Sequence, residues 1–314
     1  MNIVFFGTSE FAISALRELL SSRHKILALV TQPDRKKGRN LKLSSPPTKI
    51  LALTKGIPVY QPDNVSSLES INYLKKLDAD IFVVISFGQI LKKELLAIPK
   101  FYAINLHGSL LPKYRGAAPT NWAVINGDKS SGLTIIRMNE VMDEGDIILK
   151  QEIGIDDDDT NITLSEKLSE LGAKVLLEVV GSIESGRKLN FVKQNDNQSS
   201  LAPKLKKEDG LIDWNEKAIR IYNKVRGLLP WPGAYTHYNG RTLKILQTEL
   251  VNDPIAGSMA QPGEVVGIVK DKGILVNTAL GFLAIKYLQL EGKKILDADS
   301  FVRGHKIEKG YRFR

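Results

Sequence analysis

Three polar side chains stand in two short stretches of the sequence and could together do chemistry. Asn105 and His107 lie two residues apart in NLHGSLLPKYRGAAP, and Asp143 follows in MDEGDII. A neutral imidazole accepts a proton, a carboxylate orients the ring and stabilises its protonated form, and a carboxamide donates to a developing oxyanion. The set fits direct transfer of an acyl group to an amine. Because spacing gives no three-dimensional proximity, a His satisfied in a loop and an Asp in a turn stay an alternative.

The rest of the sequence argues against several other kinds of site. The 314 residues contain no Cys, which excludes disulfides, thiolate metal sites and a thiol nucleophile. No Ser stands in a nucleophile elbow, so a covalent acyl-enzyme is not indicated. GTSEFA lacks the G-x-G-x-x-G of a dinucleotide cradle, and GRNLKLSS lacks the G-K-[ST] ending of a P-loop. The acidic run 156–159 favours the start of a helix over a metal site, and we expect no metal.

Alternating strands and helices must position these side chains. Apolar runs alternate with stretches of helical spacing through residues 1–189, which predicts an α/β fold with a Rossmann-like, mainly parallel sheet. Asn105 and His107 fall at the carboxyl end of their strand, where such sheets bind ligands, and alternate residues share one face. The predicted strands are 1–6, 25–31, 56–62, 79–86, 101–107, 132–138 and 148–155, and the predicted helices are 10–22, 49–55, 65–77, 91–96, 117–126 and 164–185.

The sequence changes character after residue 189. Residues 190–208 are polar and irregular, and we interpret them as a linker between a catalytic domain, 1–189, and a second domain, 209–314. Short strands with turn signals favour a small OB-like β-barrel in the second domain. A helix is predicted at 215–226, and strands at 235–238, 242–248, 263–269, 273–277 and 281–290.

Positive charge is concentrated in two places. The net charge is +9; residues 31–50, predicted as a long loop, hold six Lys and Arg and one acidic residue, and residues 206–314 hold 18 basic and 12 acidic residues. A polyanionic partner held at two places and a merely solubilising surface explain this distribution equally well. The sequence shows neither a cleavable signal nor an apolar run of the roughly 18 residues that span a bilayer. We expect a cytoplasmic protein without a membrane partner.

Several motifs resemble those of the folate-dependent formyltransferases. NLHGSLLPKYRGAAP with the downstream MDEGDII is similar to the signature of that family, whose Asn-x-His-x-S-L-L-P core is shared widely among its branches. FFGTSEFA, VTQPDRKKGR, RGAAP, KEDGLIDW and WPGAYT resemble the branch that formylates methionine on initiator tRNA. The resemblance covers nearly the whole chain. It implies 10-formyltetrahydrofolate as co-substrate and a monomer that acts in translation initiation.

The resemblance also implies roles for individual residues. His107 would be the base, supported by Asp143, and Asn105 would stabilise the oxyanion. The folate site would comprise Ser109, Leu110, Leu111 and Pro112, with Gln89, Ile90 and Leu91 as a second wall. The tRNA-binding residues would be Arg35, Lys36, Lys37, Arg39 and Lys42. The basic loop departs from the family's usual GRG by having GRN, which keeps Arg39 but changes its neighbour.

Two other functions stay open. Another formyltransferase, acting on a nucleotide sugar or on glycinamide ribonucleotide, would keep the Asn, His and Asp. A glycinamide enzyme would lack the C-terminal domain, and a sugar enzyme would have little need of the basic loop. A non-catalytic RNA-binding protein on an old enzyme scaffold would not need an intact set of Asn105, His107 and Asp143.

Overall fold

The computed structural model describes residues 1–37, 42–251 and 260–314, which form two compact units. The first unit comprises Met1–Pro119, Ser131–Ile153 and Ser165–Pro203, and the second comprises Thr120–Ser130, Gly154–Leu164 and Lys204–Arg314. The predicted division into a domain, a linker and a second domain stays a prediction. None of the helices in the described ranges combines the length and the apolar character needed to cross a membrane.

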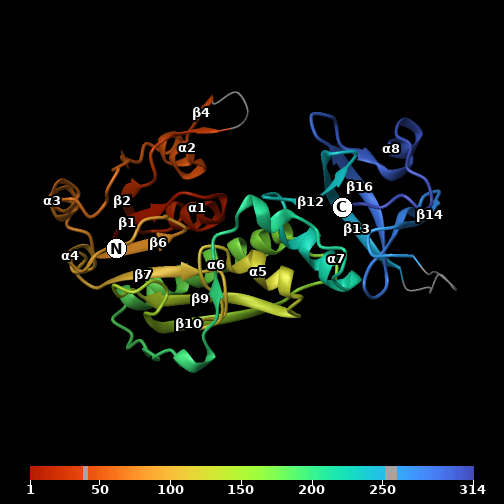
Figure 1. The fold of residues 1–314 in the computed structure, drawn as a ribbon. Coiled ribbons are helices and arrows are strands. Elements are labelled where there is room, and N and C mark those ends of the chain that lie inside the picture. The colour runs from red at the N-terminus through yellow and green to blue at the C-terminus, as the bar shows by residue number, and fades with distance from the viewer. Residues whose placement is uncertain (38–41, 252–259) are drawn as a thin grey trace. The chain divides into compact units, whose positions relative to one another are not determined.

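A seven-stranded sheet, in the order β10-β9-β7-β6-β1-β2-β5, is the frame of the first unit (Figure 1). Neighbouring strands are parallel from β7 to β5, and β9 runs antiparallel to β7. The strand order reverses between β1 and β6, as in doubly wound folds. This confirms the predicted mainly parallel, Rossmann-like sheet. Its strands are β1 Asn2–Gly7, β2 Lys25–Val30, β5 Val59–Tyr60, β6 Ile81–Ile85, β7 Tyr102–His107, β9 Ser130–Arg137 and β10 Asp146–Gly154.

Helices cover both faces of this sheet because its central strands are apolar on both. Phe5 of β1 belongs to the buried cluster that includes Leu176 of α6, whereas its neighbour Phe6 belongs to the cluster that includes Leu74 of α3. A strand buried on both faces reads as a continuous apolar run, which is why the predicted and observed bounds of β1, β2, β6 and β7 agree within two residues. The predicted strand 56–62 is much shorter in the structure, where β5 comprises only Val59–Tyr60. The helices are α1 Ile13–Ser21, α2 Pro47–Thr54, α3 Leu68–Lys76, α4 Lys93–Leu96 and α6 Asn161–Glu184.

The basic stretch after β2 contains a short hairpin where a loop was predicted. β3 (Arg35–Lys37) pairs with β4 (Lys42–Ser44) in antiparallel register, with Lys36 opposite Leu43. Residues 38–41 lie outside the described part of the chain. The loop prediction was wrong for the two strands, because three consecutive charged residues show neither an apolar run nor alternation.

Helix α6 begins three residues earlier than predicted. The backbone N–H of Thr163 donates to Thr160 Oγ1 at 3.2 Å, and the backbone N–H of Thr160 donates to Thr163 Oγ1 at 3.0 Å. The reciprocal pair therefore joins two hydroxyl residues, Thr160 and Thr163. Two Thr three residues apart satisfy the same orphan N–H groups as the usual Ser/Thr and Glu pair.

Part of the predicted linker is ordered against the first unit. Residues 194–202, called the strap below, end in β11 (Leu201–Ala202), which pairs in parallel with β8 (Arg115–Gly116). The backbone N–H of Arg115 also donates to Ser200 O at 2.8 Å. A pair of two-residue strands in a polar segment has no periodic signal, so sequence reasoning could not find it.

The second unit contains an antiparallel sheet in the order β12-β13-β16-β15-β14, with β17 beside β16. Alternating burial along β12 and β13 places Leu243 and Ile245 in its interior. Each predicted strand is found here, as expected for a small OB-like β-rich unit. The elements are α7 Ala218–Gly227, β12 Ala234–Tyr238, β13 Arg241–Val251, β14 Val265–Val269, β15 Gly273–Asn277, β16 Phe282–Leu290, β17 Leu296–Asp297 and α8 Ala298–Gly304.

Candidate active site

The structure brings the three predicted catalytic side chains together at the carboxyl end of β7. Asn105 Nδ2 donates to Asp143 Oδ1 at 3.3 Å, and His107 Nδ1 lies 3.5 Å from the same oxygen. The side chains of His107 and Asp143 are only 6% and 10% exposed. Asn105 and His107, on one face of β7, therefore both lie next to the carboxylate of Asp143. This residue belongs to a loop, 36 positions after His107 in the sequence. The spacing of Asn105, His107 and Asp143 in the sequence could not show that the three side chains are neighbours, and the structure shows that they are.

The surroundings of His107 determine which ring nitrogen is basic. His107 Nε2 lies 2.9 Å from the carbonyl oxygen of Tyr114, which can only accept a hydrogen bond. The neutral ring therefore carries its hydrogen on Nε2, and Nδ1 presents the lone pair on the side of Asp143. When Nδ1 takes a proton, the nearby carboxylate stabilises the imidazolium. The role of the Tyr114 carbonyl was missed by sequence reasoning, because a backbone acceptor leaves no mark on residue type.

The two oxygens of the Asp143 carboxylate face different groups. Oδ1 faces Asn105 and His107, whereas Oδ2 accepts a 2.8 Å hydrogen bond from the backbone N–H of Gly116. A Cβ at residue 116 would lie 2.7 Å from Ala202 O, and φ is +125° there, so only Gly fits. A carboxamide carries two N–H bonds, so Asn105 can bind Asp143 and still donate to a second acceptor.

The predicted folate loop is held firmly by a buried hydroxyl. Thr134 Oγ1, on β9 directly opposite His107, donates to Ser109 O at 2.7 Å and accepts from the backbone N–H of Leu111 at 3.0 Å. Ser109 Oγ donates to Lys113 O at 2.6 Å, and the Leu111 side chain is fully buried in a small core cluster. Within this stretch the side chains of Ser109 and Leu111 are thus committed to the fold, so the loop can present mainly backbone to a ligand.

In the predicted second wall, residues 89–91, two side chains are also committed to the fold and one is exposed. Gln89 Oε1 accepts from the backbone N–H of Val65 at 2.8 Å, and its Nε2 donates to Pro62 O at 3.2 Å. Leu91 is buried in the core, but Ile90 is 67% exposed. Of these three residues, Ile90 presents an apolar side chain to solvent.

The predicted tRNA-binding residues lie on the hairpin, as far as the structure describes them. Arg35 and Lys36 are exposed on β3, and the backbones of Lys37 and Lys42 are paired. Arg39 falls outside the described residues. The hairpin is fixed at its base by Asp34, whose carboxylate accepts hydrogen bonds from Lys49, Gln61 and Ser45. These bonds, that of Lys49 first, lower the pKa of Asp34 to about 2.

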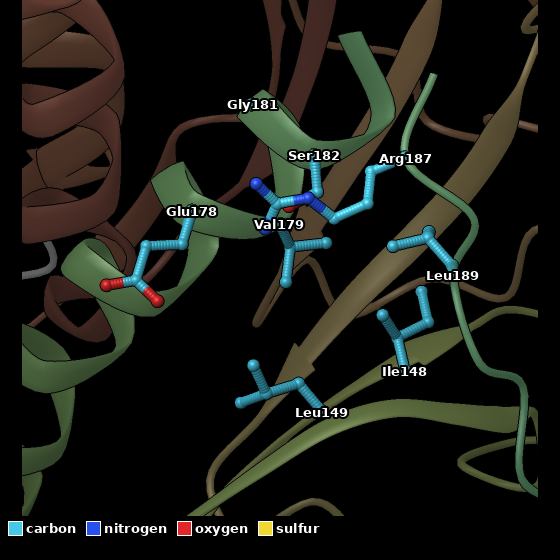
Figure 2. A pocket seen from close by; sticks show the side chains of 8 residues that line it. All are labelled: Ile148, Leu149, Glu178, Val179, Gly181, Ser182, Arg187 and Leu189. Atoms are coloured by element: carbon cyan, nitrogen blue, oxygen red, sulfur yellow. The ribbon is translucent and has the colours of Figure 1, made fainter. Parts of the chain in front are cut away.

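One cavity in the first unit lies apart from these residues. It has a volume of about 440 Å³ and is lined by side chains of β10, α6 and the segment after α6 (Figure 2). Figure 2 shows Leu149 of β10 below Val179 of α6, with the Arg187 side chain extending above Val179. None of the predicted catalytic or folate-binding residues lines this cavity.

Comparisons with known proteins agree with the motifs. A family model described as formyl transferase matches residues 1–180, and one described as formyl transferase, C-terminal domain, matches residues 204–306. The methionyl-tRNA formyltransferase of Geobacter sulfurreducens is 45% identical over 99% of this chain and 96% of its own length. That of Citrifermentans bemidjiense is 46% identical over 99% of this chain and 95% of its own length.

Solved structures share the fold at lower identity. A sugar 3N-formyl transferase crystallised in the presence of dTDP and 5-N-formyl-THF superposes with a TM-score of 0.66 and 20% identity, covering 94% of this chain and 99% of that one. HypX from Aquifex aeolicus in complex with tetrahydrofolic acid superposes with a TM-score of 0.62 and 16% identity, covering 99% of this chain and 50% of that one. At these identities the likeness extends to the fold alone.

Proposed function

Because the chain belongs to the formyl transferase family, we propose that it transfers a formyl group from 10-formyltetrahydrofolate to the α-amino group of methionine on initiator tRNA. The observation that carries this function is the 45% and 46% identity, over nearly the full length of each chain, to two methionyl-tRNA formyltransferases. The protein is thus a transferase of translation initiation, and we place it in the cytoplasm, where its acceptor is made. The monomeric state stays a prediction.

The proposed reaction is a direct transfer, and the proton that the amine loses ends on the departing tetrahydrofolate. The methionyl nitrogen attacks the formyl carbon and forms a C–N bond, which gives a tetrahedral intermediate; when this intermediate collapses, the bond from that carbon to N10 of the folate breaks. His107 Nδ1, the basic nitrogen left by the bond between Nε2 and Tyr114 O, takes the proton that the amine loses. The proton then passes to N10 of the departing tetrahydrofolate, so His107 ends the cycle neutral.

Asn105 and Asp143 support this step through charge. The tetrahedral intermediate carries an oxyanion, and the carboxamide of Asn105 has an N–H to spare for it beside the one that binds Asp143. Asp143 Oδ1, 3.5 Å from His107 Nδ1, stabilises the imidazolium while the intermediate exists. Burial of both side chains keeps bulk water from weakening these interactions.

The folate co-substrate is assigned to residues 109–112 and 89–91. The bonds of Thr134 to Ser109 O and the Leu111 N–H hold the first loop in one conformation, so it can offer its backbone to the pterin without reorganising. Exposed Ile90 is the apolar group of the second loop that is free to contact the ring system. No metal takes part in this proposal.

The acceptor tRNA is assigned to the basic hairpin and to the basic second unit. Arg35 and Lys36 are exposed on β3, and we extend the assignment to Lys37, Arg39 and Lys42 on grounds of sequence. Exposed cations attract the phosphates of a tRNA acceptor arm and release its counterions on binding. A sugar enzyme would have little need of the basic hairpin.

A competition between acceptors tests the function. The purified protein is incubated with 10-formyltetrahydrofolate, methionyl-tRNA and a nucleotide amino sugar, and the formylated products are separated. The sugar is the appropriate competitor, because a sugar 3N-formyl transferase shares the fold. We expect formylmethionyl-tRNA as the product; formylated sugar with unmodified methionyl-tRNA would overturn the proposal.

A further inference from the structure

We propose that Arg115 and Gln194 act as a pair of positioning residues that hold Asp143 in place for the transfer. The inference deepens the function proposed above and rests on it for its kinetic test. Gln194 binds the backbone of the loop that carries Asp143. Arg115 binds the Gln194 side chain and the side chain of Glu144 in that loop.

The Arg115 guanidinium is buried, and each of its three nitrogens donates a hydrogen bond. Its side chain is only 8% exposed, although Arg is rarely buried without partners. Nε and one terminal nitrogen donate to Gln194 Oε1 at 3.1 and 2.9 Å; the terminal nitrogens also reach Glu144 Oε1 at 3.0 Å and Asp196 Oδ1 at 2.7 Å. The guanidinium therefore joins the strap to the acidic residue directly after Asp143.

This engagement decides which way the Gln194 carboxamide faces. A guanidinium only donates, so the amide must turn its oxygen toward Arg115. The amide nitrogen then faces the other way, where it donates to Asp143 O at 2.7 Å and to Gly145 O at 2.9 Å. One side chain thus binds two backbone carbonyls of the loop, and Arg115 fixes its orientation.

The loop needs such support because its conformation is unfavourable. Asp143 has φ +58°, in the left-handed region that non-Gly residues rarely occupy. Gly145 lies so close to the preceding strand end that a Cβ there would be 1.9 Å from Arg137 O. Gln194 holds the backbone of the loop, and the Gly116 N–H holds the Asp143 carboxylate at 2.8 Å. Gly116 belongs to β8, and Gln194 belongs to the strap that ends in β11.

The test replaces Gln194 by Glu, which has nearly the same size and shape. Glu keeps an acceptor for Arg115 but has no N–H for the carbonyls of Asp143 and Gly145, and it sets a negative charge against them. We expect kcat to fall about 10- to 100-fold, as for a misplacement of about 1 Å at a reacting group, while KM for methionyl-tRNA and folate changes less than about threefold. Gln198→Glu is the matched control, because it makes the same charge change at an exposed position of the strap.

Two further variants separate positioning from general damage. Gln194→Met removes both donors without adding charge, and we expect it to lower kcat as Gln194→Glu does if the bonds to the carbonyls matter. Arg115→Lys keeps the charge but loses the planar fork that orients the amide, and its kcat should also fall. A kcat for Gln194→Glu and Gln194→Met within twofold of that of Gln198→Glu would overturn the inference.

A measurement without turnover distinguishes this inference from the proposed function. Hydrogen exchange of the Gly116 amide reports its bond to the Asp143 carboxylate directly. We expect faster exchange at Gly116 in Gln194→Glu than in Gln198→Glu or in the unaltered protein. Unchanged exchange would refute the positioning role whatever the activity, whereas an unaltered protein that leaves methionyl-tRNA unmodified would contradict the function and not the positioning role.

Discussion

Two regions of the first unit, the Asp143 loop and the basic hairpin, are held in opposite ways. The loop is bonded on both sides: Asn105 and Gly116 bind the Asp143 side chain, and Gln194 binds its backbone. The hairpin is fixed at its base, where Asp34 binds three side chains, and its cations Arg35 and Lys36 extend into solvent. The Asp143 carboxylate is thus buried and held by hydrogen bonds, whereas Arg35 and Lys36 of the hairpin are exposed to solvent.

This difference matches the two tasks of the proposed reaction. Stabilising a transition state requires groups already placed where charge develops, because reorganisation at that moment costs rate. Attracting a polyanion requires positive charge within about a Debye length, roughly 10 Å at 0.1 M salt, and tolerates variation in geometry. Substitutions in the loop region should therefore lower kcat, and substitutions in the hairpin should raise KM for tRNA.

The largest expected effect is on His107. His107→Ala removes the proposed base, and we expect kcat to fall by about 10³-fold, within the usual range for general base catalysis, with tRNA binding unchanged. Single-turnover formylation gives the rate, and a filter-binding titration gives the tRNA affinity. Added imidazole should restore part of the rate in the cavity left by the ring. A variant with near-normal turnover would remove His107 from the mechanism.

A smaller loss is expected at Asn105. Asn105→Ala removes an oxyanion donor and a partner of Asp143, and kcat should fall by about 10²-fold, as for other donors of this kind. Imidazole should give no rescue here, which separates the two roles at this site. If Asn105→Ala raised KM for folate and left kcat unchanged, the side chain would bind the ground state instead.

The hairpin should respond in KM and in salt dependence. Replacing Arg35 and Lys36 together by Ala should lower kcat/KM for methionyl-tRNA about tenfold, mainly through KM, since each cation neutralises a phosphate through a screened interaction. The slope of log affinity against log salt should decrease by about 1 for each phosphate that is no longer neutralised. Lys75→Ala with Lys76→Ala, on exposed positions of α3, makes the same charge change and serves as control. If the two double substitutions had equal effects, the hairpin would contribute only non-specific charge to tRNA binding.

The same contrast explains what could be predicted from the sequence. The central strands were found because burial on both faces requires apolar runs such as Ile81–Ile85, and the place of Asn105 and His107 at a strand end followed from them. The supports of the candidate site were not found. They depend on the Tyr114 carbonyl, the Thr134 hydroxyl and the Gln194 amide, which show no periodicity and become neighbours only when the chain is folded.

The C-terminal half shows the same limit of sequence reasoning. The strands β12 and β13, whose residues alternate in burial, were predicted from the sequence. The elements β17 and α8 were not predicted, because each is short. In the first unit, the contacts of the residues predicted to bind folate could not be predicted from the sequence either. Leu111 and Gln89 have the residue types of a binding site, and only their surroundings show that the core and a neighbouring loop use them.

The smallest effect is expected for a substitution of Asp34 at the base of the hairpin, and it can be measured through the pH dependence of stability. Hydrogen bonds from Lys49, Gln61 and Ser45 favour the carboxylate and hold the pKa of Asp34 at about 2, below the ordinary 3.8. A carboxyl group whose pKa is lower in the folded state stabilises the fold above its unfolded pKa, and that stabilisation disappears as pH falls through the folded value.

Asp34→Asn should therefore lower the melting temperature slightly and by a constant amount from neutral pH down to about pH 4, and the difference from the unaltered protein should shrink between about pH 4 and pH 2. Since the bonds lie near the surface, we expect kcat/KM for tRNA to fall only about two- to fivefold, and kcat to stay the same. A fall in kcat instead would mean that the hairpin base supports the transition state, and the division between a buried catalytic loop and an exposed charged hairpin would not hold.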